Sequence, residues 1–160
     1  MELYMEKMST DAAIDILSWR YDQPYDFYNN EYTPEAISEM LAETFFSVLD
    51  DAEELIGFFC VGSSAQVPNE LYTYSQGFID IGLGMRPELT GQGNGTLFFT
   101  AVLNEMDKMF GNSSQRLTVA KFNERALRLY EKLGFRREAE FVKGNTVFIV
   151  MIKVKARNQK

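Results

Sequence analysis

The sequence of 160 residues contains no histidine and only one cysteine, Cys60. The absence of histidine excludes catalysis by an imidazole base and removes the usual ligand of zinc, so we expect no metal site. A single cysteine excludes an intrachain disulfide and favours a reducing compartment. Cys60 lies in an apolar, strand-like run from 55 to 61, which predicts a buried, inert thiol rather than a nucleophile.

Long apolar runs are also missing. No stretch approaches the roughly 20 residues that a membrane helix requires, and the first residues lack the basic segment and apolar core of a signal peptide. We therefore expect a cytoplasmic protein without a membrane partner. Basic residues are in the minority: 16 Lys and Arg stand against 23 Asp and Glu, giving a net charge of −7. This balance argues against nucleic acid and favours cationic partners.

The remaining pattern of apolar residues predicts an α/β fold. Strands are expected at 1–8, 44–49, 54–61, 79–85, 116–120, 135–142 and 146–154, and helices at 11–19, 34–42, 96–110 and 123–133. Thr10 is the expected cap of the first helix, and Thr33-Pro34 is the expected start of the second, with proline at its first position. The polar segment 62–76 is expected to be a mobile loop. This succession predicts one domain, 1–155, with a mixed, largely antiparallel sheet flanked by helices, and a basic tail at 156–160 that is either a solvated terminus or a binding arm.

The segment from Trp19 to Tyr32 is dense in aromatic residues and reads as a loop or broken helix. Its aromatic side chains could simply pack on the core. Alternatively, they form a wall of an acceptor pocket in which Asp22, Asp26 or Glu31 holds an amine cation.

A glycine-rich turn joins the strand at 79–85 to the helix at 96–110. Gly91, Gly93 and Gly95 directly precede the helix. Backbone N–H groups at a helix start lack intrahelical partners and carry the positive end of the dipole, so this order predicts either an anion-binding loop or a tight turn only. Thr96 stands where a Walker loop needs Lys and where a dinucleotide fingerprint needs glycine, so neither signature fits.

Two motifs resemble those of the GCN5-related N-acetyltransferase (GNAT) family. The run from Pro87 to Gly95 resembles the family's pyrophosphate loop, with Gly93 and Gly95 at its two small positions and Thr90 where Arg or Gln is expected. The run 122–135 is similar to the second half of the family signature. The matching residues there are Asn123, Ala126, Tyr130, Gly134 and Phe135. The motifs cover about a third of the chain, and the order of elements extends the resemblance to most of it.

The resemblance implies a GNAT-like fold and acetyl-CoA as co-substrate. In the family, loop N–H groups bind the pyrophosphate, and the end of the preceding strand pairs with the pantetheine arm and polarises the thioester carbonyl. The residues that the resemblance assigns to cofactor binding are Leu83, Gly84, Met85, Gly91, Gln92, Gly93, Asn94, Gly95, Thr96, Asn123 and Tyr130. Because that binding relies largely on the backbone, Thr90 is expected to lower affinity without removing the site.

Three residues have competing interpretations. The family makes Tyr130 the general acid that protonates the departing thiolate, and a packed core tyrosine is the alternative. Asn123 either only caps its helix or also hydrogen-bonds a ligand amide. Deprotonating a lysine-like amine at pH 7 costs about 4.6 kcal/mol. Asp80 is therefore either a base acting directly or through water, or a solvent-facing or hydrogen-bonded acid without catalytic function.

Together these observations predict an N-acetyltransferase that transfers the acetyl group from acetyl-CoA directly to a primary amine, with neither a covalent enzyme intermediate nor a metal. A small cationic amine is the favoured acceptor, and a protein N-terminus is the rival. Two further alternatives are a non-catalytic acyl-CoA sensor and a structural module that only docks partners. The expected partners are acetyl-CoA and an amine, and a homodimer is left open.

Overall fold

The computed structural model describes residues 2–155, so the predicted basic tail at 156–160 lies outside the described residues. The strands are β1 (Leu3–Lys7), β2 (Phe45–Asp50), β3 (Leu55–Val61), β4 (Ile79–Met85), β5 (Gln115–Ala120), β6 (Arg136–Lys143) and β7 (Thr146–Lys153). The helices are α1 (Thr10–Ser18), α2 (Pro34–Met40), α3 (Gly95–Phe110) and α4 (Glu124–Lys132), with 3-10 turns η1 (Tyr25–Tyr28), η2 (Gly62–Ala65) and η3 (Pro87–Leu89). Within residues 2–155, no helix has both the length and the apolar character of a membrane span.

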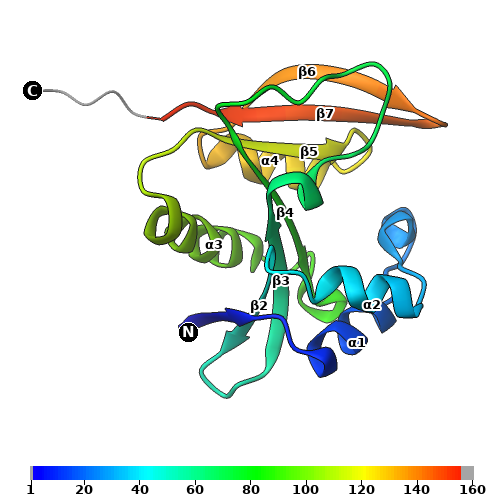
Figure 1. The fold of residues 1–160 in the computed structure, drawn as a ribbon, viewed down its shortest axis with the longest axis vertical. Helices are drawn as coiled ribbons and strands as arrows, with labels where there is room; N and C mark the ends of the chain where they lie inside the picture. The colour runs from blue at the N-terminus through cyan, green and yellow to red at the C-terminus, as the bar shows by residue number, and fades with distance from the viewer. Residues whose placement is uncertain (1, 156–160) are drawn as a thin grey trace, which may run out of the picture. The chain divides into compact units, whose positions relative to one another are not determined.

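The strands follow the order β1-β2-β3-β4-β5-β7-β6 (Figure 1). The pairs β1–β2, β2–β3, β5–β7 and β6–β7 are antiparallel, whereas β4 and β5 are parallel. The predicted α/β class with a mixed, largely antiparallel sheet is therefore confirmed. The chain divides into two compact units: unit 1 comprises Met1–Cys60 and Leu83–Ala101, and unit 2 comprises Val61–Gly82 and Val102–Lys160.

Unit 1 combines β1, β2, β3 and the end of β4 with α1 and α2, which lie side by side (Figure 1). Its core includes Val48 and Phe59, both fully buried. The cap of α1 is Ser9, whose Oγ accepts a hydrogen bond from the Ala12 N–H. The prediction of Thr10 as cap was wrong by one position, because both hydroxyl residues suit this role. The second helix, α2, begins at Pro34 as predicted, and Thr33 caps it.

Close packing of β3 on the end of β4 depends on a glycine in unit 1. A Cβ added at Gly57 would lie 2.5 Å from the Gly84 carbonyl oxygen and 2.7 Å from the Phe98 ring. Such distances are sterically forbidden, so any larger residue at Gly57 would push the last residues of β4 away. The position of that strand end matters because the glycine-rich turn follows it directly.

Unit 2 contains the start of β4, the strands β5, β7 and β6, and α4 (Figure 1). Its core includes Val150 and Met151 on β7, both fully buried, and Leu127 on α4. The apolar stripe of α4 is buried, whereas its charged residues are exposed. This pattern follows from the helical spacing of Leu127 and Tyr130.

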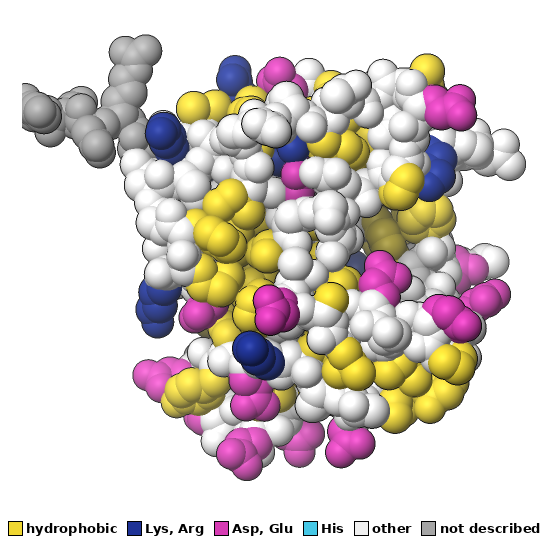
Figure 2. Space-filling view, in the orientation of Figure 1, with side chains coloured by type: hydrophobic (Ala, Val, Ile, Leu, Met, Phe, Trp, Pro, Cys, Tyr) yellow, Lys and Arg dark blue, Asp and Glu magenta, His cyan; other side chains and the backbone are white. Residues whose placement is uncertain are grey.

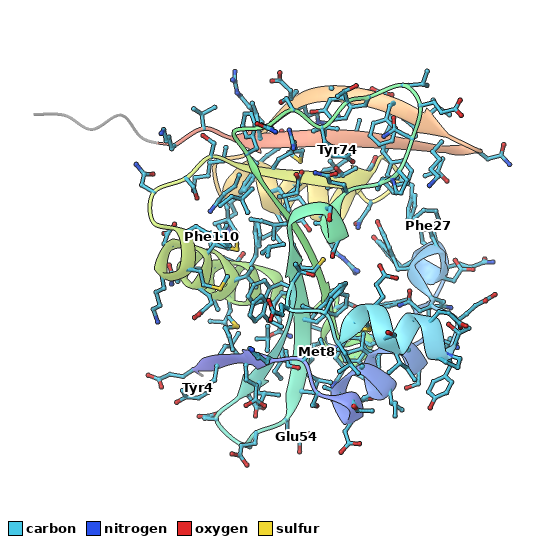
Figure 3. The ribbon with its side chains drawn as sticks, viewed as in Figure 1. Tyr4, Met8, Phe27, Glu54, Tyr74 and Phe110 are labelled. Atoms are coloured by element: carbon cyan, nitrogen blue, oxygen red, sulfur yellow. The ribbon has the colours of Figure 1, made fainter. Side chains whose placement is uncertain are left out.

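The segment between η2 and β4 is anchored in unit 2, in contrast to the mobile loop that its polar composition predicted. Gln66 Nε2 donates to Asp80 at 2.9 Å, and the Tyr74 hydroxyl lies 2.8 Å from Thr118 Oγ1 and accepts from the Val67 N–H (Figure 3). The Tyr72 ring stacks on Phe141, with centroids 5.8 Å apart. The polar composition of the segment could not predict these anchors, because Asp80, Thr118 and Phe141 lie on strands that are distant in the sequence.

Candidate active site

The turn between β4 and α3 is tied together by its own side chains. Three alternating side chains donate to three successive carbonyl oxygens: Thr90 to Pro87 at 2.7 Å, Gln92 to Glu88 at 2.6 Å and Asn94 to Leu89 at 3.0 Å. Each bond closes a short ring of chain. The turn is therefore held in shape by these side chains, together with the N–H groups of Leu89 and Thr90, which donate to the Arg86 and Pro87 carbonyls. The N–H groups of Gly91, Gly93 and Gly95 are not used for that purpose.

Those N–H groups remain available for a ligand. No protein acceptor is found within residues 2–155 for the N–H groups of Gly91, Gly93 and Gly95. The backbone conformations of Gly91 (φ 70°) and Gly93 (φ 81°) are left-handed, and the space around Gly93 is open. The first N–H of α3 that bonds to the chain is that of Phe98, to the Asn94 carbonyl at 3.0 Å. This arrangement fits a pyrophosphate at the positive end of the helix dipole.

Thr90 occupies the position where the family expects a basic or amide side chain. Its hydroxyl is directed back to the Pro87 carbonyl. The side chain therefore stabilises the turn, and position 90 lacks the long cationic or amide group that the family pattern places there. The Thr90 side chain thus departs from the family pattern, and phosphate binding by this turn would rely on backbone N–H groups.

The end of β4 is held by two residues that the sequence analysis did not identify. The Tyr21 hydroxyl donates to the Met85 carbonyl at 2.6 Å. The Arg86 guanidinium donates to the Leu55 carbonyl at 2.7 Å, pairs with Asp15 at 3.5 Å and lies over the Trp19 ring at 5.8 Å. The sequence shows an arginine between the end of a strand and Pro87, but it does not reveal which residues that arginine contacts. Leu83, Gly84 and Met85 form the partly exposed end of β4.

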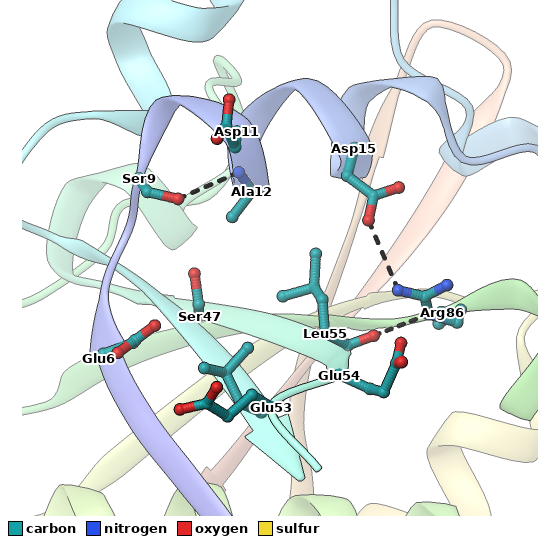
Figure 4. Close-up of a pocket in the computed structure, with 11 residues that line it drawn as sticks. Glu6, Ser9, Asp11, Ala12, Asp15, Ser47, Glu53, Glu54, Leu55 and Arg86 are labelled. Atoms are coloured by element: carbon teal, nitrogen blue, oxygen red, sulfur yellow. Dashed lines mark hydrogen bonds and ion pairs between the residues drawn. The ribbon is translucent and has the colours of Figure 1, made fainter.

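Arg86 also lines a polar cavity in unit 1. The cavity has a volume of about 490 Å³, and Figure 4 shows Arg86 bonded to Asp15 and to the Leu55 carbonyl. Its acidic lining residues are Glu6, Asp11, Asp15, Glu53 and Glu54. None of the predicted catalytic or cofactor-binding residues lines this cavity, so it is separate from them.

Unit 1 is strongly acidic, with 15 Asp and Glu side chains against 3 Lys and Arg. Figure 2 shows acidic side chains exposed over α1, α2 and the hairpin of β2 and β3. In the segment 19–32, Asp22, Asp26 and Glu31 are exposed, and no ion pair to them is found within residues 2–155. Phe27 projects from η1 and is 46% exposed (Figure 3). The segment thus presents unpaired carboxylates beside accessible aromatic surface.

Tyr130 and Asn123 belong to α4 in unit 2. Tyr130 is 8% exposed, and its ring lies 6.4 Å from that of Phe135. Asn123 caps the helix, because its Oδ1 accepts from the Ala126 N–H at 3.1 Å. The capping role is confirmed. Binding of a ligand amide by Asn123 and protonation by Tyr130 stay predictions.

Asp80 forms a buried ion pair with Arg116. The Arg116 Nε and Nη2 donate to the two carboxylate oxygens at 2.7 and 2.8 Å, and Gln66 adds a third donor. Arg116 is 1% exposed, and its guanidinium lies 5.0 Å from the Tyr74 ring centre. Hydrogen bonding with Asp80 raises the pKa of Arg116, so the guanidinium stays charged. Of the two interpretations of Asp80, this geometry favours the hydrogen-bonded acid.

The comparisons with known proteins agree with the motifs. The family model described as "Acetyltransferase (GNAT) family" matches residues 11–135. A comparison with curated proteins gives no match. Among solved structures, spermidine N-acetyltransferase from Vibrio cholerae in complex with CoA and spermine has a TM-score of 0.72 and 18% identity, over 96% of this chain and 95% of that one.

Two other structures show the same fold. A GNAT-family acetyltransferase from Bacillus anthracis has a TM-score of 0.72 at 18% identity, and an aminoglycoside acetyltransferase in complex with coenzyme A has 0.72 at 17% identity. Each alignment covers 96% of this chain and 95% of the other. The family match spans most of the chain, and the strand order and the glycine turn before α3 accord with it. The chain belongs to the GNAT family of acetyltransferases.

Proposed function

We propose that the protein transfers an acetyl group from acetyl-CoA directly to the primary amine of a small cationic molecule. The observation that carries this proposal is the set of N–H groups at Gly91, Gly93 and Gly95, which have no protein acceptor within residues 2–155. A rigid turn with unused donors at a helix N-terminus suits a pyrophosphate. Similar proteins have been solved with coenzyme A bound, which supports the same choice of co-substrate.

The co-substrate supplies an activated acetyl thioester, and the chain's own residues hold and orient it. In this proposal, residues 91–96 bind the pyrophosphate through N–H groups, and residues 83–85 orient the pantetheine arm. Asn123 contributes its amide to the same arm. One bond forms between the amine nitrogen and the acetyl carbon, while the carbon–sulfur bond breaks. Tyr130 gives its proton to the departing thiolate. A phenol (pKa near 10) is a weaker acid than a thiol (near 8.5), so this transfer costs only about 2 kcal/mol, and the tyrosinate then regains a proton from water.

The amine must lose a proton to attack, and Asp80 is the remaining candidate for the base. Its ion pair with Arg116 makes a route through water more suitable than direct contact. Asp80→Asn tests the role by its pH dependence. Loss of a base is compensated near pH 11, where a lysine-like amine of pKa about 10.4 is largely neutral, whereas loss of a structural ion pair is not. A rate deficit that persists at high pH would therefore contradict the catalytic role.

The acceptor proposal rests on charge. Asp22, Asp26 and Glu31 lack basic partners within residues 2–155, and aromatic faces beside them favour an ammonium group. The similar spermidine acetyltransferase was solved with spermine, a polycation of this class. Thiol release should therefore be faster with polyamines than with N-terminal peptides. A preference for the peptides would favour the protein N-terminus as acceptor.

The decisive experiment incubates the purified protein with acetyl-CoA and a panel of amines and follows free thiol. Amine-dependent release supports the transferase. Tight CoA binding without release supports the sensor. If CoA at 100 times its expected dissociation constant adds none of the roughly 2.7 kcal/mol of stability, the structural module is favoured. Intact mass after incubation with acetyl-CoA alone should show no acetylated enzyme, because direct transfer forms none.

A further inference from the structure

Tyr21 connects two parts of unit 1 that the proposed function assigns to different substrates. It belongs to the aromatic segment 19–32, which is the proposed acceptor wall. Its hydroxyl donates to the carbonyl of Met85, the last residue of β4, at 2.6 Å. Two residues later, at Pro87, η3 and the glycine-rich turn begin. A single hydrogen bond therefore joins the acceptor segment to the strand that leads into the cofactor loop.

The backbone of Tyr21 is anchored as firmly as its side chain. The Tyr21 N–H donates to Asn29 Oδ1 at 2.8 Å, which closes a ring of chain that contains η1. Burial, together with the negative charge of Glu88, raises the pKa of Tyr21 to about 12. The hydroxyl thus stays protonated and able to donate at neutral pH.

We propose that Tyr21 is a positioning residue that couples the acceptor segment to the acetyl-CoA site by fixing the end of β4. This inference rests on the proposed function, since it assigns the coupling to that same site. The Met85 carbonyl, held by Tyr21, fixes the peptide plane that joins Met85 to Arg86. Binding of CoA to the strand and turn should in turn restrain the segment 21–32.

The test compares Tyr21→Phe with wild type, using CoA as the probe. The variant keeps the ring and loses only the donor. CoA affinity, measured by titration calorimetry, should fall about five- to tenfold, as expected for one neutral hydrogen bond. Saturating CoA should slow chymotrypsin cleavage within 21–32 in the wild type and should no longer do so in the variant. A purely structural role would lower the unfolding temperature without removing this CoA-dependent protection.

Two further variants make the test independent of how well Tyr21→Phe folds. Asn29→Ala removes the anchor of the Tyr21 backbone and should weaken CoA binding in the same direction, whereas Asn29→Asp keeps an acceptor oxygen and should restore it. Tyr4→Phe is the matched control, because this exposed tyrosine also loses one hydrogen bond, to Glu2. Its CoA affinity should equal that of the wild type.

The outcomes separate the inference from the proposed function. If the wild type binds CoA and Tyr21→Phe binds it equally well with unchanged protection of 21–32, the coupling is wrong and the proposed function stands. If the wild type does not bind CoA, both fall together. If Tyr21→Phe is misfolded, equal CoA affinity of Asn29→Ala and wild type overturns the coupling.

Discussion

Asp80 is the acidic member of a buried ion pair, and its partner Arg116 comes from the neighbouring strand. It was the only acid among apolar residues in its strand, and both a base and a hydrogen-bonded acid were consistent with that. The parallel register of β4 and β5 places Arg116 opposite it. Parallel pairing between strands that are separated by a helix is non-local, so a local pattern could not reveal the partner. The buried ion pair follows directly from that register.

We expect Arg116→Met to destabilise the protein by about 3–5 kcal/mol, because it leaves the Asp80 carboxylate buried without its cation. Urea unfolding measures this loss. Arg128→Met is the matched control: Arg128 pairs with Glu124 on the surface, where the side chains are 79% and 75% exposed, so the loss should be below about 1 kcal/mol. The double variant Asp80→Leu with Arg116→Met should be more stable than Arg116→Met alone. Equal losses for Arg116→Met and Arg128→Met would contradict the importance of the buried pair.

The raised pKa of Tyr21 leads to a prediction of how the free energy of unfolding depends on pH. In the unfolded chain a tyrosine ionises near pH 10, but in the folded protein the pKa of Tyr21 is raised to about 12, mainly by burial. Between these values unfolding releases a proton, so the free energy of unfolding falls as pH rises. Below pH 10 neither state is ionised and this contribution is constant.

Tyr21→Phe should therefore flatten the decline of the unfolding free energy between pH 10 and 12. The difference in slope cannot exceed about 1.4 kcal/mol per pH unit, the value for one proton. Urea unfolding at pH 9, 10 and 11 measures the slope, and Tyr32→Phe, at a tyrosine that is 56% exposed, serves as control. Parallel curves for wild type and Tyr21→Phe would show that Tyr21 does not keep its proton in this range.

At the scale of elements, local patterns predicted all seven strands and four helices to within about two residues. Period-two alternation gave β4 its full length, and glycine at positive φ, as at Gly111 and Gly134, marked the ends of α3 and α4. The three 3-10 turns were missed because they carry no periodic signal. The segment 62–76 was predicted to be mobile, whereas the structure anchors it. Tyr74 contacts β5 and Tyr72 contacts β6, and a local pattern does not reveal contacts with distant strands.

The cofactor turn gives a prediction at this scale. Thr90→Arg should tighten CoA binding by up to about tenfold, because a guanidinium can bond the pyrophosphate with charge assistance, while loss of the Thr90 bond to Pro87 offsets part of the gain. Calorimetric titration at low and high salt measures it, and the gain should shrink at high salt. Thr90→Val, which loses the hydroxyl without adding a cation, is the matched control and should bind CoA more weakly than the wild type. Tightening by Thr90→Val as well would contradict a phosphate contact.

At the scale of the whole molecule, charge is divided unevenly. Unit 1 carries 15 acidic and 3 basic side chains, and unit 2 carries 8 acidic and 13 basic ones. The net charge of −7 conceals this difference. A cationic amine is attracted by the field of the acidic surface that includes the segment 19–32, whereas an anionic co-substrate is not. Composition alone reveals the balance of charge, whereas its division between the two units is visible only in the folded protein.

This division predicts different salt responses for the two proposed substrates. With spermidine as acceptor, kcat/KM should fall roughly tenfold as ionic strength rises from about 10 to about 200 mM, because the screening length shrinks from about 30 Å to below 10 Å. With butylamine, which carries one charge, the fall should be much smaller, and kcat/KM for acetyl-CoA should not fall in parallel. Thiol release at fixed pH measures all three, and unfolding temperatures over the same salt range control for stability. Equal slopes for spermidine and butylamine would show that the acidic surface does not guide the acceptor, and would leave recognition to contacts inside the site.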